Sequence, residues 1–297
     1  MDGQEPAVQL PLVVIVGPTA SGKTALAVRL ASHYNGEIIC AASRTVYKGM
    51  DIGTAKPTPQ ERALVPHWGL DLVGPNEGFS AADFKAYATA TIDQIRARGA
   101  VPFLVGGTGL YVDGVVFDYQ FGAAPDAAER ASYMALTATQ LQQLCRERGL
   151  ALPANPANKR HLVRLLEQKG TNNQRRQRPL PGTIIVGIAT EREVLRQRIA
   201  ERAEHIFHHA VAQEAKTLGR LYGWNSEAMT GNIYPIMQRY LCGEIDAATA
   251  REQFFYRDWH LANRQLTWLR RNPFITWLAL DEAEQFLAQK LAKKQSP

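Results

Sequence analysis

The architecture of this chain is set by one segment, Val13-Val14-Ile15-Val16-Gly17-Pro18-Thr19-Ala20-Ser21-Gly22-Lys23-Thr24. Four β-branched residues predict a buried strand, and the G-x-x-x-x-G-K-T pattern that follows is typical of a P-loop. The apolar spacing of residues 25–30 predicts a helix directly after the loop. Glycines let backbone N–H groups turn inward, and the positive end of the helix dipole points to the same place. The segment therefore predicts a site for a phosphate or a diphosphate.

Two side chains of this loop have chemistry that suits such a ligand. Lys23 supplies a mobile positive charge, and the Thr24 hydroxyl is a suitable ligand for Mg²⁺. The pattern is shared by nucleotide- and ATP-binding proteins, so it does not identify the phosphate compound or the bond that is broken.

A second glycine loop, Gly106-Gly107-Thr108-Gly109, follows the apolar run at residues 101–105, which we interpret as a parallel strand. Because ligands bind at the carboxyl ends of parallel strands, we expect both loops to face one crevice. An alternative explanation is that these glycines form a tight turn and bind no ligand. The expected diphosphate site consists of Gly17, Thr19, Ala20, Ser21, Gly22, Lys23, Thr24 and Thr108.

The composition fits a globular protein. The chain has 297 residues, 45% of them hydrophobic, and no apolar run reaches the roughly 18 residues of a membrane span. Residues 1–11 contain acidic residues and no basic stretch, so they do not predict a secretory signal. Three cysteines without metal-like spacing indicate a reducing compartment, which we expect to be the cytoplasm. The net charge of +6 favours a polyanionic partner, although incidental basicity explains it as well.

The remaining segments predict an α/β fold, with a P-loop NTPase-like parallel sheet flanked by helices and a helical insertion domain. We assign residues 1–111 and 182–297 to the P-loop core and residues 112–181 to the insertion, in which residues 126–149 and 155–170 have helical patterns. Arg160 and Arg164 lie four residues apart on one helix face. This spacing suits contacts with phosphates, but it also describes an ordinary solvated face.

Arginines also mark the predicted helices of the carboxyl-terminal part. Residues 191–221 predict one long helix with Arg198 and Arg202 on one face, and an arginine pair near a P-loop can clamp a leaving diphosphate. Further on, Arg264, Trp268 and Arg271 are expected to align on one helix face. Aromatic rings stack on unpaired bases and arginines bind phosphates, but these residues would equally form a core with a charged rim.

Six short motifs are spread over most of the chain. They are GPTASGKT at 17–24, EII at 37–39, YKGMDIGTAKP at 47–57, VGGTGLY at 105–111, a reduced R-x-x-R-x-x-E at 161–167 and ANRQLTWLRR at 262–271. In combination they resemble the tRNA dimethylallyltransferase family, which transfers an isoprenyl group to adenine N6 beside the anticodon. The motifs GMDIGTAKP and RQLTWLR have no role in generic P-loop kinases, so the combination is far more specific than the P-loop alone.

The resemblance implies a P-loop that binds the diphosphate of dimethylallyl diphosphate with Mg²⁺ and does not use ATP. Thr24 would hold Mg²⁺, while Lys23 and either Arg198 or Arg202 would stabilise the departing diphosphate. Adenosine 37 of tRNA would be turned out of its stack to reach the donor. The resemblance also implies that the core and the insertion grip the tRNA anticodon arm. We expect the protein to be a monomer. The residues it assigns to tRNA are Ser43, Arg44, Thr45, Lys56, Arg160, Arg164, Tyr234, Arg264, Trp268 and Arg271.

The chain departs from the family at the position of the catalytic base. After EII the family reads S-x-D-S-x-Q-x-Y, whose Asp accepts a proton from the adenine amine, whereas here Ala42 and Thr45 stand at the Asp and Gln positions. Loss of a general base typically costs about 10²- to 10⁴-fold in rate. Three explanations stay open: an engineered knockout, a slow natural variant that uses Ser43 or Asp51, and a binding protein without catalysis. Other departures at expected tRNA-facing positions are His161, Trp259 and Asn263.

Three other functions compete with prenyl transfer. Ala42 motivates a tRNA anticodon-arm binding protein without turnover, which would bind RNA with a strong salt dependence and give no product. The P-loop alone motivates a small-molecule kinase or NTPase, which would use ATP. A free-adenylate isopentenyltransferase is the third, and competition by AMP against tRNA would identify it.

Overall fold

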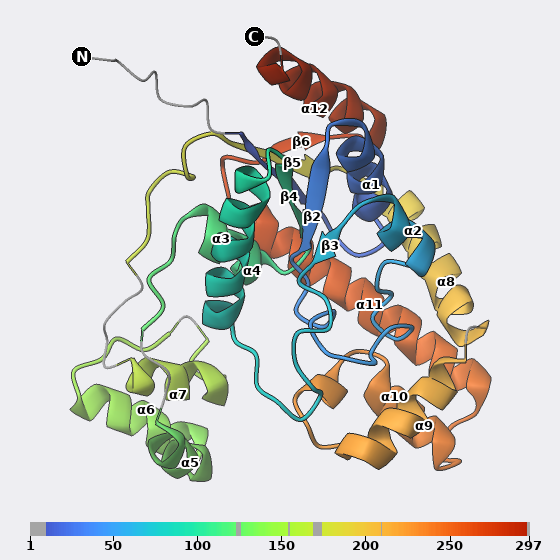
Figure 1. The fold of residues 1–297 in the computed structure, drawn as a ribbon. Coiled ribbons are helices and arrows are strands. Elements are labelled where there is room, and N and C mark those ends of the chain that lie inside the picture. The colour runs from blue at the N-terminus through green and yellow to red at the C-terminus, as the bar shows by residue number, and fades with distance from the viewer. Residues whose placement is uncertain (1–9, 123–125, 154, 169–173, 209, 296–297) are drawn as a thin grey trace. The chain divides into compact units, whose positions relative to one another are not determined.

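The fold is described by a computed structural model that covers residues 10–122, 126–153, 155–168, 174–208 and 210–295 (Figure 1). Most of the segment for which we predicted no secretory signal, residues 1–11, lies outside the described residues. The chain forms two compact units, one of residues 1–116 and 179–297 and one of residues 117–178. The second unit is shorter than the predicted insertion, because residues 112–116 continue helix α4 (Gly109–Val116) with a mostly buried apolar surface.

A parallel six-stranded sheet forms the centre of the first unit, within the described residues. Its order is β3-β2-β4-β1-β5-β6, with bounds Leu12–Val16 (β1), Gly36–Cys40 (β2), His67–Trp68 (β3), Val101–Gly106 (β4), Thr183–Ile188 (β5) and Thr276–Leu278 (β6). In this register Val16 lies opposite Gly106, and Cys40 lies opposite Val105. The carboxyl ends of β1, β4 and β2 are therefore neighbours, which confirms the predicted α/β fold and brings the two glycine loops to one edge.

Helices cover both faces of this sheet (Figure 1). Helices α1 (Lys23–His33) and α12 (Leu280–Gln295) contact each other over one face, while α3 (Ala81–Ala97) and α4 contact each other and β4 on the opposite side. Side chains alternate along a strand, and the central strands β1, β2 and β4 of this doubly covered sheet are buried on both faces. This arrangement explains why the strands read as continuous apolar runs in the sequence.

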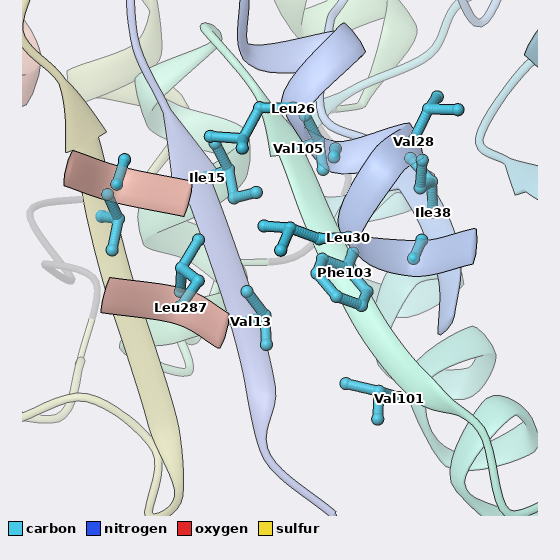
Figure 2. Close-up of a cluster of buried hydrophobic side chains, with 14 of the residues drawn as sticks. Val13, Ile15, Leu26, Val28, Leu30, Ile38, Val101, Phe103, Val105 and Leu287 are labelled. Carbon is cyan, nitrogen blue, oxygen red and sulfur yellow. The ribbon is translucent and has the colours of Figure 1, made fainter. Parts of the chain in front are cut away.

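The core between the sheet and helices α1 and α12 holds the P-loop strand in place. Figure 2 shows Val13 and Ile15 of β1 and Phe103 of β4 beneath Leu26 of α1 and Leu287 of α12. All five side chains are fully buried. Truncating a buried phenylalanine such as Phe103 to alanine typically costs about 3–5 kcal/mol of stability. The loop between β1 and α1 is thus anchored at both ends by well-packed elements.

The other helices of the first unit are α2 (Pro59–Leu64), α8 (Arg192–His208), α9 (Val211–Tyr222), the 3₁₀ helix η1 (Ala228–Thr230), α10 (Tyr234–Leu241) and α11 (Ala247–Leu269). The prediction of one helix over residues 191–221 is wrong. Ala210 adopts a left-handed conformation with φ of 56° and separates α8 from α9. Neither glycine nor proline occurs between residues 191 and 218 to signal this break. No helix in the described part of the chain is long and apolar enough to cross a membrane.

The second unit contains helices α5 (Ala127–Ala135), α6 (Ala138–Glu147) and α7 (Lys159–Glu167). The predicted helical stretch at 126–149 is divided in two because Thr137 caps the start of α6. Its side chain accepts a hydrogen bond from the Gln140 backbone, and the Gln140 side chain accepts one from the Thr137 backbone. The apolar core of this unit consists of Tyr133, Leu141, Cys145, Leu162, Val163 and Leu166.

Candidate active site

The P-loop turns sharply between β1 and α1. Gly22 caps α1 in the left-handed region, with φ of 87°, where a residue with a side chain is strained. At Gly17, an added Cβ would lie 2.8 Å from the Ser21 hydroxyl, so a side chain there would disturb the loop. The backbone conformation therefore favours glycine at position 22, and the Ser21 side chain leaves little room for a Cβ at position 17.

The interior of this loop has the properties of an anion site. Ser21 is fully buried, and its hydroxyl has no hydrogen-bond partner among the described residues. A buried hydroxyl without a partner is costly unless a ligand satisfies it. The adjacent amino terminus of α1 favours negative charge. These features fit a diphosphate, and the partly exposed Thr24 on the first turn of α1 fits an oxygen ligand to its Mg²⁺.

Lys23 lies at the mouth of the loop. Its Nζ donates a hydrogen bond to the Pro18 carbonyl at 2.9 Å. Desolvation of the ammonium, and to a smaller extent the positive charge of Arg202, lower the pKa of Lys23 to about 8. A diphosphate would supply the negative charge that this ammonium lacks, so ligand binding and protonation of Lys23 favour each other.

The second glycine loop is tied to the end of β2. A Cβ at Gly106 would overlap the Ala41 carbonyl, so only glycine allows this approach. The Thr108 backbone N–H donates to the Ala41 carbonyl at 3.2 Å, and the Thr108 hydroxyl accepts from the Ser43 backbone N–H at 3.0 Å. The glycines thus serve a close approach of two loops, and Thr108 bridges them.

Ala42 lies partly exposed at this junction. Its carbonyl accepts hydrogen bonds from the Thr45 backbone at 3.3 Å and from the Thr45 hydroxyl at 3.0 Å. Thr45 is buried, which leaves its hydroxyl poorly placed for the RNA contact that we predicted. Ser43 is partly exposed beside Ala42. At the position where the resemblance predicts a general base, the structure therefore has a methyl group, with a serine hydroxyl as the neighbouring polar group.

Helix α11 reaches both glycine loops with two side chains. The Gln265 side-chain oxygen accepts a hydrogen bond from the Thr19 backbone N–H at 2.8 Å. One turn further, the Trp268 indole N–H donates to Asp113 at 2.7 Å, and its ring lies so close to Gly109 that a Cβ there would overlap it. Gln265 is not among the site residues expected from the sequence, although it stands inside the RQLTWLR motif that carries the resemblance.

The structure distinguishes the two arginines of α8 that the sequence left as alternatives. Arg198 Nη1 lies 3.5 Å from the Ser21 carbonyl of the P-loop. Arg202 forms an ion pair with the buried Asp258, at 3.1 Å between Nε and Oδ2. Both predicted residues lie near the loop, but Arg198 touches its backbone directly, whereas Arg202 is engaged by α11.

Two residues that we predicted to bind tRNA are buried instead. The Lys56 side chain is 1% exposed, and its ammonium lies 2.7 Å from Asp51 and 2.6 Å from Asp71. Tyr234 is also buried; its hydroxyl donates to Glu214 at 2.8 Å, and burial together with that carboxylate raises the pKa of Tyr234. The polar groups of both side chains already have partners inside the protein, and their contact with RNA stays a prediction.

These buried residues position the loop at 47–57. The Glu214 carboxylate accepts hydrogen bonds from three successive backbone N–H groups, those of Asp51, Ile52 and Gly53, at 2.7–2.9 Å. Lys56 additionally donates to the Tyr47 carbonyl at 2.7 Å. We missed Glu214 in the sequence because nothing in its local pattern links it to a loop more than 150 residues away. The loop that continues from Ala42 is therefore rigidly held.

The remaining residues predicted to contact tRNA differ in their exposure and in their partners within the protein. Arg44 donates to the Glu227 carbonyl at 2.6 Å, and Arg264 is exposed on α11. Arg271 lies beyond the end of α11, so it does not share a helix face with Trp268, although its guanidinium lies 5.8 Å from that ring. Their contact with RNA stays a prediction.

In the second unit, the two predicted phosphate-binding arginines of α7 differ. Arg160 is exposed, whereas Arg164 lies 3.4 Å from the buried Glu167 carboxylate, which also pairs with Arg130 at 3.6 Å. Arg160 is therefore the freer of the two for an external phosphate. A role of either residue in RNA binding stays a prediction.

Comparison with known proteins places this geometry in context. The family model described as IPP transferase matches residues 45–272. A tRNA dimethylallyltransferase of Roseiflexus sp. (strain RS-1) is 40% identical over 289 residues, covering 93% of this chain and 95% of the relative. That of Geobacillus kaustophilus (strain HTA426) is 37% identical over 297 residues, covering 94% and 93%.

Solved structures agree with this result. The crystal structure of the tRNA isopentenylpyrophosphate transferase of Bacillus halodurans is similar with a TM-score of 0.72 at 35% identity, covering 96% of this chain and 97% of the other. A eukaryotic dimethylallyltransferase acting on tRNA, at 22% identity and a TM-score of 0.77, shares the fold over 91% of this chain. Since the family model and the relatives both cover most of its length, the chain belongs to the IPP transferase family.

Proposed function

We propose that this protein transfers a dimethylallyl group from dimethylallyl diphosphate to N6 of adenosine 37 in tRNA and releases diphosphate. The observation that carries the proposal is that the P-loop after β1 and the loop of Ala42 after β2 leave the same edge of the sheet, on either side of β4. The resemblance places the general base at Ala42. Relatives named tRNA dimethylallyltransferase, at 37–40% identity over most of the chain, support it. The proposed enzyme acts as a monomer in the cytoplasm.

In the proposed reaction the adenine N6 forms a bond to the first carbon of the prenyl group. The bond from this carbon to oxygen breaks, its electron pair leaves with the diphosphate, and N6 loses a proton. The P-loop amides, Lys23 and Arg198 stabilise the negative charge that collects on the leaving group. Mg²⁺, held by Thr24 and the phosphate oxygens, would supply further charge neutralisation when bound.

The proton that leaves N6 needs an acceptor. Ala42 cannot accept it, and Ser43 is the nearest polar side chain along the loop, hydrogen-bonded through its backbone to Thr108. A serine hydroxyl is a weak base at neutral pH, so we propose slow turnover. The methyl group at Ala42 also favours a second candidate, a protein that binds the tRNA anticodon arm without turnover.

The experiment that separates these candidates is a transfer assay with dimethylallyl diphosphate, Mg²⁺ and unmodified tRNA, followed by mass spectrometry of the nucleosides. A tRNA with guanosine at position 37 lacks the amine and serves as the control substrate. Prenylated adenosine that forms only with adenosine 37 supports the enzyme. Salt-sensitive tRNA binding without product, even after long incubation, supports the binding protein.

A second experiment tests the assignment of Ala42. Ala42→Asp introduces a carboxylate where the family has its base, and we expect the transfer rate to rise by about 10²- to 10⁴-fold. Ala42→Asn is the matched control, because its amide has a similar size but cannot accept the proton. An equal rate for both variants would show that position 42 does not hold the base.

A further inference from the structure

Gln265 of helix α11 binds a backbone N–H group of the P-loop, although it is not part of the loop. Its side-chain oxygen, the only amide atom that can accept a hydrogen bond, lies 2.8 Å from the Thr19 backbone nitrogen. The N–H of Thr19 is therefore not available to a phosphate. In a P-loop the backbone N–H groups are the donors that cradle phosphates, so one donor of this loop is already engaged within the protein.

The position of Lys23 shows which end of the phosphate site loses the N–H group of Thr19. In P-loops the lysine reaches the terminal phosphates of the ligand, while the amides at the start of the helix cradle the others. Here Lys23 Nζ lies 2.9 Å from the carbonyl of Pro18, which directly precedes Thr19. The terminal phosphate of a longer chain would therefore extend toward Thr19, where it meets the oxygen of Gln265.

Helix α11 holds Gln265 firmly in this place. The next residue, Leu266, packs in a cluster with Ala20 of the P-loop and with Leu195 and Ile199 of α8. On the opposite side, a Cβ at Gly107 would overlap the Gln265 amide nitrogen, so the second glycine loop confines the side chain. The amide cannot withdraw from Thr19 without disturbing both loops.

We propose that Gln265 determines the specificity of the P-loop for diphosphates over triphosphates, by occupying the Thr19 N–H and the adjacent space. A third phosphate would find no free amide there and would place its oxygens against a side-chain oxygen of like partial charge. This inference rests on the proposed function and deepens it, because it explains why a P-loop of ordinary sequence accepts a prenyl diphosphate and excludes ATP.

The test compares binding of inorganic diphosphate and inorganic triphosphate, each with Mg²⁺, by isothermal titration calorimetry without RNA or prenyl donor. The wild-type protein is expected to prefer diphosphate. Gln265→Ala frees the Thr19 N–H and the space beside it, so the preference should fall by roughly tenfold, the value of one hydrogen bond to a charged group. Gln265→Met fills the space without an acceptor and should change the preference in the same direction but less.

Thr267→Ala is the matched control on the same helix. Its hydroxyl bonds to the Asn263 carbonyl at 2.9 Å within α11, and the residue is exposed. Its ratio of diphosphate to triphosphate affinity should equal that of the wild type. An unchanged ratio in both Gln265 variants, with thermal unfolding like the wild type, would overturn the inference alone. Absence of binding by either anion to the wild type would overturn the proposed function as well.

Discussion

The charge of Lys23 should control binding of the prenyl donor within the physiological pH range. Burial and Arg202 lower the pKa of Lys23 to about 8 in the free protein. About nine-tenths of the lysine is then charged at pH 7, about half at pH 8 and about one-tenth at pH 9. If the diphosphate binds only the charged form of Lys23, the affinity is near its maximum below pH 7 and falls roughly tenfold between pH 7 and pH 9.

The assay is calorimetric titration with dimethylallyl diphosphate and Mg²⁺ at several pH values between 7 and 9. Lys23→Arg is the reference protein, because a guanidinium stays charged throughout this range. Arginine fits the loop less well, so we expect the Lys23→Arg variant to bind the donor more weakly. The pH profile of this variant still contains the ionisation of the ligand and of all other groups. The ratio of the wild-type affinity to the Lys23→Arg affinity therefore isolates the titration of Lys23.

We expect this ratio to fall roughly tenfold from pH 7 to pH 9, with its midpoint near the pKa of about 8. Arg202→Gln should move the midpoint upward, because it removes the second positive charge. A ratio that stays constant over this range would refute the reasoning, since it would mean that the ammonium titrates at its ordinary pKa or does not contact the diphosphate.

Three further predictions follow from individual contacts. Lys56→Met removes a buried ammonium from its two aspartate partners and should lower the free energy of unfolding by about 1–3 kcal/mol in urea titration; unchanged stability with weaker tRNA binding would instead support the surface role. Gly109→Ala should displace the Trp268 ring and alter its fluorescence. Gly78→Ala is the control, because an added Cβ there meets nothing within 4 Å, and equal spectra for the two variants would contradict this packing. Ala42→Asp should also strengthen pH dependence of transfer below neutrality, because a carboxylate base is lost on protonation; a pH profile like that of the wild type would argue against this role.

The sequence was sufficient for the parts of the fold that depend on short-range patterns. The P-loop, the apolar strands and the second glycine loop each carry a local signal, and the parallel register then brings the loops to one edge. Glycines at positions 106 and 109 looked like weak evidence because their reason lies elsewhere in the chain: one faces the Ala41 carbonyl and the other the ring of Trp268. Only the folded structure shows that close approach requires them.

The sequence does not show which polar side chains are buried or which partners they have. A lysine in a polar loop reads as a surface residue, yet Lys56 is enclosed because Asp51, Asp71 and a backbone carbonyl replace its hydration. Arg198 and Arg202 are equivalent by helical spacing, and only their contacts with the Ser21 carbonyl and with Asp258 distinguish them. Gln265 reaches Thr19 across 246 residues, a contact that no local pattern indicates.

The central claim is that the glycine loop at residues 17–24 holds the diphosphate of a prenyl donor. A crystal structure with bound dimethylallyl diphosphate and Mg²⁺ tests it most directly. We predict that both phosphates lie between the loop amides and Lys23, that Arg198 contacts them, and that the prenyl carbon points toward Ala42. Density for the diphosphate outside this loop, or ATP bound in it with its third phosphate beside Thr19, would contradict the account.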